Sequence, residues 1–393
     1  MNKKRDTSPK KKRTVKTKSF PIVGVGASAG GLEAFEGLFS SMPSDINIAF
    51  IIVQHLDPKH KSIMGTLLQK YTNMQINEAE DGMKIKPNCI YLNPPGKNMI
   101  IANGVLHLSD PIERHSANLP VDSFFRSLSE DQSEKAICII LSGTGSDGTI
   151  GMKAIKGAGG MAMAQDTKQA KYDGMPRNAI NTGLVDYVVP VEKMGQELIK
   201  YIKHPYIEHP DKLSITKQQY QSYIQKIFAL IRSKTGHDFS HYKQNTIRRR
   251  IERRLAVHQI ANIADYIRYL QQNPMEVEIL FKDLLITVTN FFRDPEAFDI
   301  LKNKGLANLL VKLPADSTFR VWVPGCATGE EAYSIAMLLV ELLEKIGKRL
   351  NIQIFATDID EEAIEHARLA AYAESIAADV SADRLAVVFY HRP

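Results

Sequence analysis

Cysteine is scarce in this sequence, and long apolar runs are absent. The three cysteines, Cys89, Cys138 and Cys326, lie far apart and are odd in number, so they suit neither a disulfide framework nor a paired-cysteine metal site. We therefore expect a reducing, cytoplasmic location and no bound metal. The apolar stretch 48–53 is far shorter than the ~20 residues of a membrane-spanning helix. The stretch 21–26 is too short, and too rich in glycine, for a secretory signal.

The chain carries little net charge once its first residues are set aside. The formal net charge is +6, but residues 1–19 alone contain nine basic residues and one acidic residue. The remaining residues contain 41 basic and 43 acidic side chains, so they are close to neutral. We expect residues 1–19 to be a disordered basic leader. A protein that binds nucleic acid over much of its surface is therefore not expected.

The length of 393 residues, with 44% hydrophobic and 24% charged residues, is typical of a globular protein with two or three folded units. Pro205 and Pro210 lie in a segment with little periodicity, which we interpret as a linker. Beyond it, the chain is at first almost free of strand patterns and later regains them. The predicted divisions are a leader at 1–19, an α/β unit at 20–203, a linker at 204–216, an all-α module at 217–313 and a partial α/β unit at 314–393.

Short apolar runs alternate with amphipathic stretches in the first unit. The runs have the length of buried strands, and the stretch 32–42 has the spacing of a helix. This alternation predicts a doubly wound, mainly parallel sheet with helices around it. The predicted strands are 21–26, 48–53, 89–92, 136–142 and 185–190.

A glycine-rich turn at 24–31 follows the first predicted strand and fits two motifs with different chemistries. The G-x-G-x-x-A pattern that starts at Gly24 is a loose dinucleotide fingerprint, whereas the G-x-S-x-G pattern centred on Ser28 is typical of an exposed nucleophile. A dinucleotide site needs an acidic residue at the end of the second strand. The chain has Gln54 and His55 there, and a histidine at this place suits a general base.

A third strand end, after 136–142, leads into a glycine-rich loop that contains Asp147. Parallel sheets gather catalytic groups at the carboxyl ends of their strands, so Ser28, His55 and Asp147 are candidates for a catalytic triad. Loop N–H groups and the dipole of the helix after Ser28 would stabilise an oxyanion. Each residue also has a structural interpretation: Ser28 as a helix cap, His55 as a surface histidine, and Asp147 as the cap of a helix that starts near Gly148.

Four motifs in this unit are GASAGG at 26–31, Gln54-His55, LSGTGSDG at 141–148 and GMP at 174–176. With these motifs, residues 20–203 closely resemble the catalytic domain of chemotaxis protein-glutamate methylesterases. The resemblance implies that Ser28 is the nucleophile, His55 the general base and Asp147 the orienting acid. It also places the main-chain N–H of Thr144 at the oxyanion position.

The implied reaction hydrolyses the methyl ester of a receptor glutamate through an acyl-enzyme, releases methanol and needs no cofactor. Deamidation of receptor glutamines is an alternative. The expected partners are methylated glutamates on the helices of chemoreceptors or similar sensory proteins. Members of this family commonly carry an N-terminal phospho-receiver domain, but here only the leader precedes Phe20. Control by phosphorylation is therefore not expected to carry over.

Residues 319–323 and 352–357 have strand patterns on either side of a predicted helix at 330–350. The loop before that helix contains two glycines, which allow the backbone to approach a nucleoside cofactor closely. The second strand leads to Asp358, which is placed to accept hydrogen bonds from ribose hydroxyls. A cofactor without a pyrophosphate is favoured over NAD, because no third glycine is present to cradle phosphates. The alternative is a strand-to-helix turn with a surface aspartate and no cofactor.

Further motifs are RRRIERR at 248–254, TVTNFFR at 287–293, TGEE at 328–331 and ATD at 356–358. With them, residues 217–372 strongly resemble the chemotaxis receptor glutamate methyltransferases, which use S-adenosylmethionine. That family typically has asparagine at the position of Thr287. The resemblance implies cofactor contacts by Thr287, Thr289, Arg293, Glu330 and Asp358.

The arginine-rich segment is interpreted through the same resemblance. An enzyme that acts on a glutamate-rich receptor helix would use positive charge to attract and hold it. A solvated helix or a nucleic-acid-binding helix is the alternative, although motifs for base readout and RNA stacking are absent. The predicted substrate-binding residues are Arg248, Arg249, Arg250, Arg253 and Arg254.

From residue 319 onward there is room for about two or three strands, whereas a Rossmann-like methyltransferase sheet needs about six or seven. We therefore expect a fragment of a longer fusion or an inactive half, and no methyl transfer by this chain alone. The predicted function is ester hydrolysis in sensory adaptation by a methylesterase fused to a partial methyltransferase. The alternative is a non-catalytic scaffold that binds receptor or signalling helices. A dehydrogenase would need the second-strand acid that is missing after residue 53.

Overall fold

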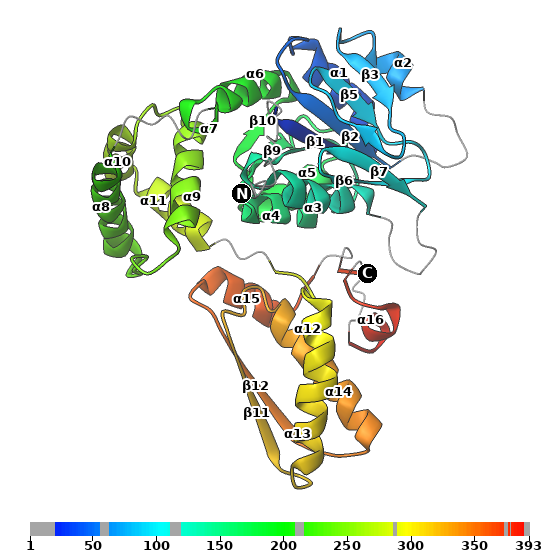
Figure 1. Ribbon diagram of the computed structural model, residues 1–393, viewed down its shortest axis with the longest axis vertical. Helices are drawn as coiled ribbons and strands as arrows, with labels where there is room; N and C mark the ends of the chain where they lie inside the picture. Colours follow the sequence, from blue (N-terminus) through cyan, green and yellow to red (C-terminus); the bar gives the residue numbers. More distant parts are fainter. Residues whose placement is uncertain are drawn as a thin grey trace, which may run out of the picture.

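The computed structural model describes residues 20–55, 63–110, 119–208, 216–285, 289–372, 376–377 and 379–388. The described chain has three parts: a sheet with helices on both faces, a group of helices, and a smaller α/β part (Figure 1). The predicted leader at 1–19 lies outside these residues. Within them, no helix combines the length and the apolar character that are needed to span a membrane.

The first part is built on seven strands whose order across the sheet is β10-β9-β8-β1-β2-β5-β3. Every neighbouring pair is parallel, which confirms the predicted doubly wound sheet. All five predicted strands are present, and β3 and β9 are additional. The strands are β1 (Ile22–Ala27), β2 (Ala49–Gln54), β3 (Gln75–Glu78), β5 (Cys89–Leu92), β8 (Ile137–Ile140), β9 (Met161–Gln165) and β10 (Tyr187–Val189).

Helices cover both faces of this sheet (Figure 1). On one face, α1 and α6 contribute Phe35 and Leu198 to an apolar core with Val23 and Val25 of β1. On the other face, α3, α4 and α5 form a second core around Phe125. Successive side chains of a strand point to opposite faces, so the apolar central strands supply both cores. These helices are α1 (Gly31–Ser40), α3 (Pro120–Gln132), α4 (Thr149–Gly157), α5 (Gly174–Asn181) and α6 (Val191–Ile202).

Gly24 and Gly26 of β1 face α3, where there is no room for a side chain. A Cβ atom at residue 24 would lie 2.8 Å from Phe125 Cε1, and one at residue 26 would overlap Val121 Cγ1. Helix α3 therefore lies against β1 at a distance that requires glycine. The glycines that also fit a dinucleotide fingerprint thus serve helix packing here.

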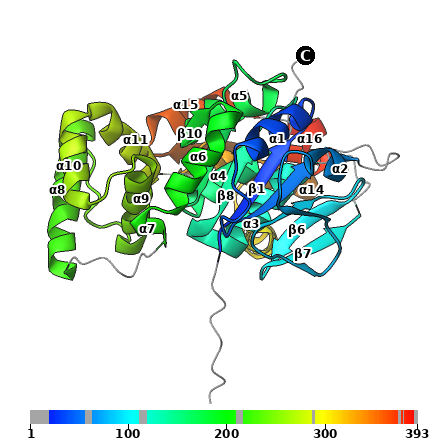
Figure 2. The same cartoon turned by 90° about the horizontal axis from the view of Figure 1, so that it is seen from above.

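A small antiparallel sheet lies beside α3 (Figure 2). Its order is β4-β7-β6, and Asn103 and Gly104 form the turn between β6 and β7 with positive φ angles of 53° and 72°. The sequence analysis did not predict this sheet. The strands are β4 (Met83–Lys84), β6 (Asn98–Ala102) and β7 (Val105–Ser109), and the short helix α2 (Met64–Leu68) precedes β3.

The all-α module surrounds its own apolar core, and residues 216–285 contain no strand. Thr216 and Gln219 form a capping box that begins its first long helix. Part of the predicted linker is the helix α7 (Pro205–Glu208), while residues 209–215 lie outside the described residues. The module contains α8 (Lys217–Thr235), α9 (Gln244–Val257), α10 (Ile263–Gln272) and α11 (Pro274–Leu285).

The third part has two parallel strands, β11 and β12, joined by the long helix α14, as predicted. The large side chains of Trp322 and Phe355 on these strands are 67% and 53% exposed. A π-helical stretch, Leu301–Leu306, separates two short helices. The elements are α12 (Pro295–Ile300), α13 (Ala307–Lys312), β11 (Thr318–Pro324), α14 (Glu330–Ile346), β12 (Asn351–Thr357), α15 (Glu361–Leu369) and α16 (Ala382–Val388).

Candidate active site

Ser28 lies in the turn between β1 and α1. Its main-chain N–H donates to Ser142 O at 3.0 Å, and its carbonyl oxygen accepts from Gly31 N at 2.9 Å. The first bond joins the turn after β1 to the turn after β8. Gly30 occupies the cap position of α1 and no side chain caps this helix, so Ser28 is not the helix cap. The half-buried hydroxyl of Ser28 makes no hydrogen bond to another described residue.

The neighbours of β1 determine what lies beside Ser28. β1 is flanked by β2 on one side and β8 on the other, so the chain changes direction across the sheet at this point. Crevices form outside the carboxyl ends of strands at such a switch point. Ala27 pairs with Gln54 in the register of β1 and β2, so Ser28 and His55 leave neighbouring strands at the same level.

His55 and Asp147 are in direct contact. The distance between His55 Nε2 and Asp147 Oδ2 is 2.7 Å, and the two side chains are 38% and 4% exposed. The imidazole is therefore partly exposed while its carboxylate partner is buried. No hydrogen bond joins Ser28 to His55 within the described chain, and since Nε2 faces the carboxylate, Nδ1 is the ring nitrogen left for Ser28.

The carboxylate of Asp147 is fixed by the beginning of α3. Its Oδ2 accepts a second hydrogen bond from Val121 N at 3.0 Å, and its Oδ1 accepts one from Asp122 N at 2.8 Å. A carboxylate at a helix N-terminus is stabilised by the unpaired N–H groups and by the helix dipole. Helix α4, which follows Asp147, is capped by Gly148 without a side-chain bond, so Asp147 does not cap its own helix.

The loop after β8 is held by the segment before α5. Gly143 N donates to Tyr172 O at 2.9 Å, and Met175 N donates to Gly143 O at the same distance. The GMP motif at 174–176 therefore supports this loop. Thr144 is exposed, and its N–H makes no hydrogen bond within the described residues, so it is available to an oxyanion.

Sequence reasoning did not find two residues that support the site. Gln165, at the end of β9, accepts a hydrogen bond from Ser142 N at 2.8 Å through its side chain. Asp122 contributes its N–H to Asp147 from the first turn of α3. Pro120 at the first position of α3, with Asp122 two residues later, is a helix-start signal that could have located this N-terminus. No local signal indicated Gln165.

The structure places the arginine-rich segment on α9, where it meets the first part at Glu134, Gly160 and Asp186. Arg253 is 1% exposed; its guanidinium bonds Gly160 O at 3.1 Å and forms an ion pair with Asp283. Arg254 is also buried and bonds Glu276 at 2.5 and 2.9 Å. This placement differs from the prediction, because buried side chains are not accessible to a receptor helix.

The other arginines of α9 divide between the interior and the surface. Arg250 is buried and donates to the carbonyl oxygen of Asp283. Arg248 pairs with Glu252 at 2.7 Å, and Arg249 lies 3.4 Å from Glu134 of the first part. The side chains of Arg248 and Arg249 are about half exposed. Substrate contact by these two arginines stays a prediction.

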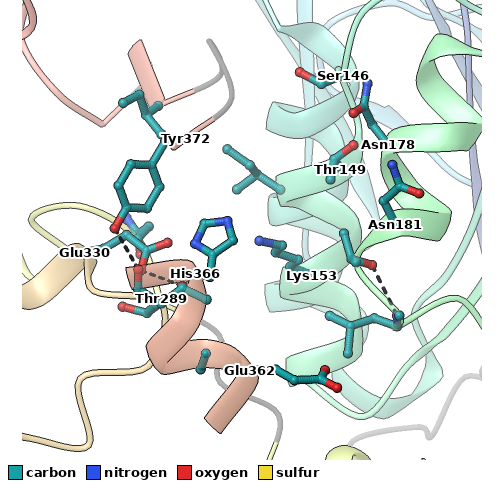
Figure 3. A pocket seen from close by; sticks show the side chains of 18 of the residues that line it. Ser146, Thr149, Lys153, Asn178, Asn181, Thr289, Glu330, Glu362, His366 and Tyr372 are labelled. Carbon is teal, nitrogen blue, oxygen red and sulfur yellow. Dashed lines mark hydrogen bonds between the residues drawn. The ribbon is translucent and has the colours of Figure 1, made fainter. Parts of the chain in front are cut away.

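Two of the predicted cofactor residues line one cavity. Thr289 and Glu330 belong to the wall of a cavity of about 480 Å³ between the third part and helices α4 and α5 of the first part. Figure 3 shows Lys153 and Asn181 opposite these residues. Glu330 is buried, and its Oε2 accepts a hydrogen bond of 2.6 Å from Thr328. A buried carboxylate beside a cavity of this size fits the hydroxyl groups of a nucleoside.

The remaining cofactor residues are less closely grouped. Arg293 and Thr289 line a second cavity, of about 600 Å³, together with Gly325. Asp358 lines neither cavity; its carboxylate accepts hydrogen bonds from Ala327 N at 2.8 Å and from Asp360 N at 3.0 Å. A carboxylate has about four acceptor sites, so these two bonds leave capacity for a ribose hydroxyl. Thr287 lies outside the described residues.

Family comparisons agree with this arrangement. Residues 23–198 match the CheB methylesterase family. Residues 222–285 match the all-alpha domain of the CheR methyltransferase, and residues 287–392 match its SAM-binding domain. The chain belongs to the CheB methylesterase family, in a fusion with CheR domains. The predicted domain boundaries stay predictions; the match to the SAM-binding domain begins before residue 314.

Individual relatives cover different shares of this CheB–CheR chain. A 104.1 kDa uncharacterized protein of Rhodobacter capsulatus is 37% identical over 337 residues, which are 81% of this chain and 35% of that protein. A protein-glutamate methylesterase/protein-glutamine glutaminase of Desulfotalea psychrophila is 34% identical over 198 residues, 49% of this chain and 54% of that protein. A putative protein of the same description from Leptospira interrogans is 34% identical over 183 residues, 46% of this chain and 95% of that protein. The chain thus spans about a third and about half of the first two relatives.

Proposed function

We propose that the chain hydrolyses methyl esters of glutamate side chains on chemoreceptor-like proteins, with Ser28 as nucleophile, His55 as general base and Asp147 as the residue that orients His55. The observation that carries this proposal is the 2.7 Å contact of His55 Nε2 with Asp147 Oδ2, one strand away from the turn that holds Ser28. The CheB methylesterase match over residues 23–198 supports it.

The chemistry follows from the placement of these groups. Ser28 Oγ attacks the ester carbonyl carbon while His55 Nδ1 takes the hydroxyl proton, and the buried Asp147 carboxylate stabilises the imidazolium that forms. The N–H of Thr144 stabilises the negative oxygen of the tetrahedral intermediate. The imidazolium then returns its proton to the leaving methoxide, which departs as methanol. Water attacks the acyl-enzyme by the same route, releases glutamate and restores Ser28.

The same machinery acts on a glutamine side chain if ammonia replaces methanol as the leaving group. Two relatives carry both activities in their descriptions, as methylesterase and glutaminase. We include deamidation in the proposal, with receptor helices as the substrate and the cytoplasm as the location. The CheR part would hold S-adenosylmethionine through Thr289, Glu330, Arg293 and Asp358, and this cofactor would supply the methyl group of the opposite reaction.

The variant Ser28→Ala tests the proposal. It removes the nucleophile, and we expect the release of methanol from a methyl-esterified receptor fragment to fall by about four or more orders of magnitude. His55→Ala should cost about as much, and the double variant little more, because the two groups act as a unit. Ser41→Ala is the matched control, since Ser41 is the C-cap of the same helix and its hydroxyl donates to Leu38 O.

Retention of wild-type hydrolysis by Ser28→Ala would contradict the proposal. If the wild-type chain and both Ser28→Ala and Ser41→Ala bind receptor helices equally well but none releases methanol, the molecule is a scaffold. If Ser28→Ala loses activity while Ser41→Ala keeps it, and the unfolding transition of Ser28→Ala is unchanged, the protein is not solely a scaffold. Release of ammonia from a receptor glutamine would identify the second substrate.

A further inference from the structure

Asp147 of the candidate triad and Asp122 each cap the N-terminus of a neighbouring helix. Asp147 precedes α4, yet its carboxylate accepts hydrogen bonds from the first turn of α3, at Val121 N and Asp122 N. Asp122 lies in that first turn of α3, yet its Oδ1 accepts a hydrogen bond of 2.6 Å from Gly151 N in the first turn of α4. The N-termini of the two helices are therefore joined by a reciprocal pair of carboxylate caps.

The helices are in close contact where these caps meet. A Cβ atom at residue 151 would lie 2.5 Å from Phe125 Cβ and 2.8 Å from the carbonyl oxygen of Asp122, so the contact requires glycine. Asp122 is buried, and its Oδ2 has no hydrogen-bond partner among the described residues. An unpartnered buried oxygen is costly, so a carboxyl group at this place needs an explanation beyond helix capping.

We propose that Asp122 is a positioning residue of the esterase site: its carboxyl group fixes α4 against α3 and thereby holds Asp147 in contact with His55. The inference rests on the proposed function, because it takes the His55–Asp147 pair as catalytic. Asp122 forms no hydrogen bond to Ser28 or His55 within the described chain and acts through Asp147. A shift of α3 relative to α4 would move both N–H groups that hold the Asp147 carboxylate.

Asp122 also places a titratable charge beside the triad. Burial, and next the neighbouring Asp147 carboxylate, raise the pKa of Asp122 to about 7, while the Gly151 N–H bond and Arg126 favour the ionised form. Arg126 is on α3 and is itself bonded to Asp379 at 2.8 and 2.9 Å. From α4, the groups that face Asp122 are the main-chain N–H groups of Gly151 and Ile150. The ionised form of Asp122 places a second negative charge beside the Asp147 carboxylate.

Asp122→Asn and Asp122→Ala separate the capping bond from the charge. Asparagine keeps an oxygen acceptor for Gly151 N, so we expect kcat on the pH plateau to stay within about threefold of wild type. The acidic limb of the pH profile should move to lower pH, because a negative charge beside the Asp147 carboxylate is removed. Alanine leaves Gly151 N without its acceptor, and kcat should fall by about tenfold to a hundredfold with little change in KM.

The assay is methanol release over about pH 5 to 9. Asp265→Asn is the control for loss of a carboxylate, since Asp265 is half-exposed on α10, far along the chain from Asp122, and bonds Asn262 and Arg268. A folded Asp122→Ala variant with wild-type kcat, or an unmoved acidic limb in Asp122→Asn, would overturn the inference. If Asp122→Ala does not fold, the pH profile of Asp122→Asn decides. Ser28→Ala is measured in parallel: its inactivity leaves the proposed function standing whatever the Asp122 variants do, and its full activity overturns both.

Discussion

Asp147→Asn tests the orienting carboxylate with almost no change in volume. Asp147 accepts three hydrogen bonds in the structure, from His55 Nε2, Val121 N and Asp122 N. Asparagine has one acceptor oxygen and one amide group with two donors. It therefore satisfies only part of this set, and each orientation of the amide has a calculable cost.

In the first orientation, the amide oxygen takes the place of Oδ2 and keeps the bonds to Val121 N and His55. The amide nitrogen then faces Asp122 N, which leaves a buried donor without an acceptor at a cost of about 1–3 kcal/mol. In the second orientation, the oxygen keeps Asp122 N, and the amide nitrogen donates to His55 Nε2. The proton of the ring then sits on Nδ1, which can no longer accept the proton of Ser28.

Both orientations also remove the negative charge that stabilises the imidazolium. We therefore expect kcat for methanol release to fall by about 10³–10⁴-fold with little change in KM. The free energy of unfolding, measured in urea, should fall by about 1–3 kcal/mol. Asp131→Asn is the control, because Asp131 is near the other end of α3 and bonds Gly104 N instead. If Asp147→Asn kept more than about a tenth of the wild-type kcat, Asp147 would not be the orienting residue.

Two further predictions concern the CheR part and its contact with the esterase part. Arg253→Met leaves the buried carboxylate of Asp283 without its cation, so the free energy of unfolding in urea should fall by about 3–5 kcal/mol. Arg249→Met removes a half-exposed ion pair with Glu134, so the free energy of unfolding should fall by less than about 1 kcal/mol. Equal decreases in the two variants would contradict the larger contribution of the buried Arg253–Asp283 pair. The described third part has two strands, whereas a Rossmann sheet has about six, so we expect no methyl transfer to receptor membranes by this chain alone; incorporation of labelled methyl groups would contradict this.

The sequence was sufficient for the central strands and for the contact between His55 and Asp147. β2 and β8 are continuous apolar runs, which is what a parallel sheet buried on both faces requires. Because parallel strands bring their carboxyl ends to one edge, residues 92 positions apart, His55 and Asp147, could be expected to meet. The prediction depended on topology alone and needed no detail of packing.

Other elements were missed for identifiable reasons. β3 lies at the sheet edge and has the polar sequence QINE, so it carries no apolar run. β6 and β7 flank Asn103-Gly104, a strong hairpin signal that could have located both strands. The bond between Asp122 and Gly151 joins residues 29 positions apart on two helices. No periodicity indicates such a bond, because it depends on how closely α3 and α4 pack.

The arginine helix shows why a run of positive charge does not by itself identify a binding surface. Arg250, Arg253 and Arg254 have the i, i+3, i+4 spacing of the inner face of a helix, and they are buried with it. Their balancing carboxylates come from distant positions, at Asp186, Glu276 and Asp283, so the charge count of the segment alone could not reveal them. Buried charges that are paired in this way exert little field outside the protein. Only the half-exposed Arg248 and Arg249 of α9 could therefore attract an acidic receptor helix, and each already pairs with a glutamate. The positive charge that α9 presents to a binding partner is therefore much smaller than its five arginines suggest.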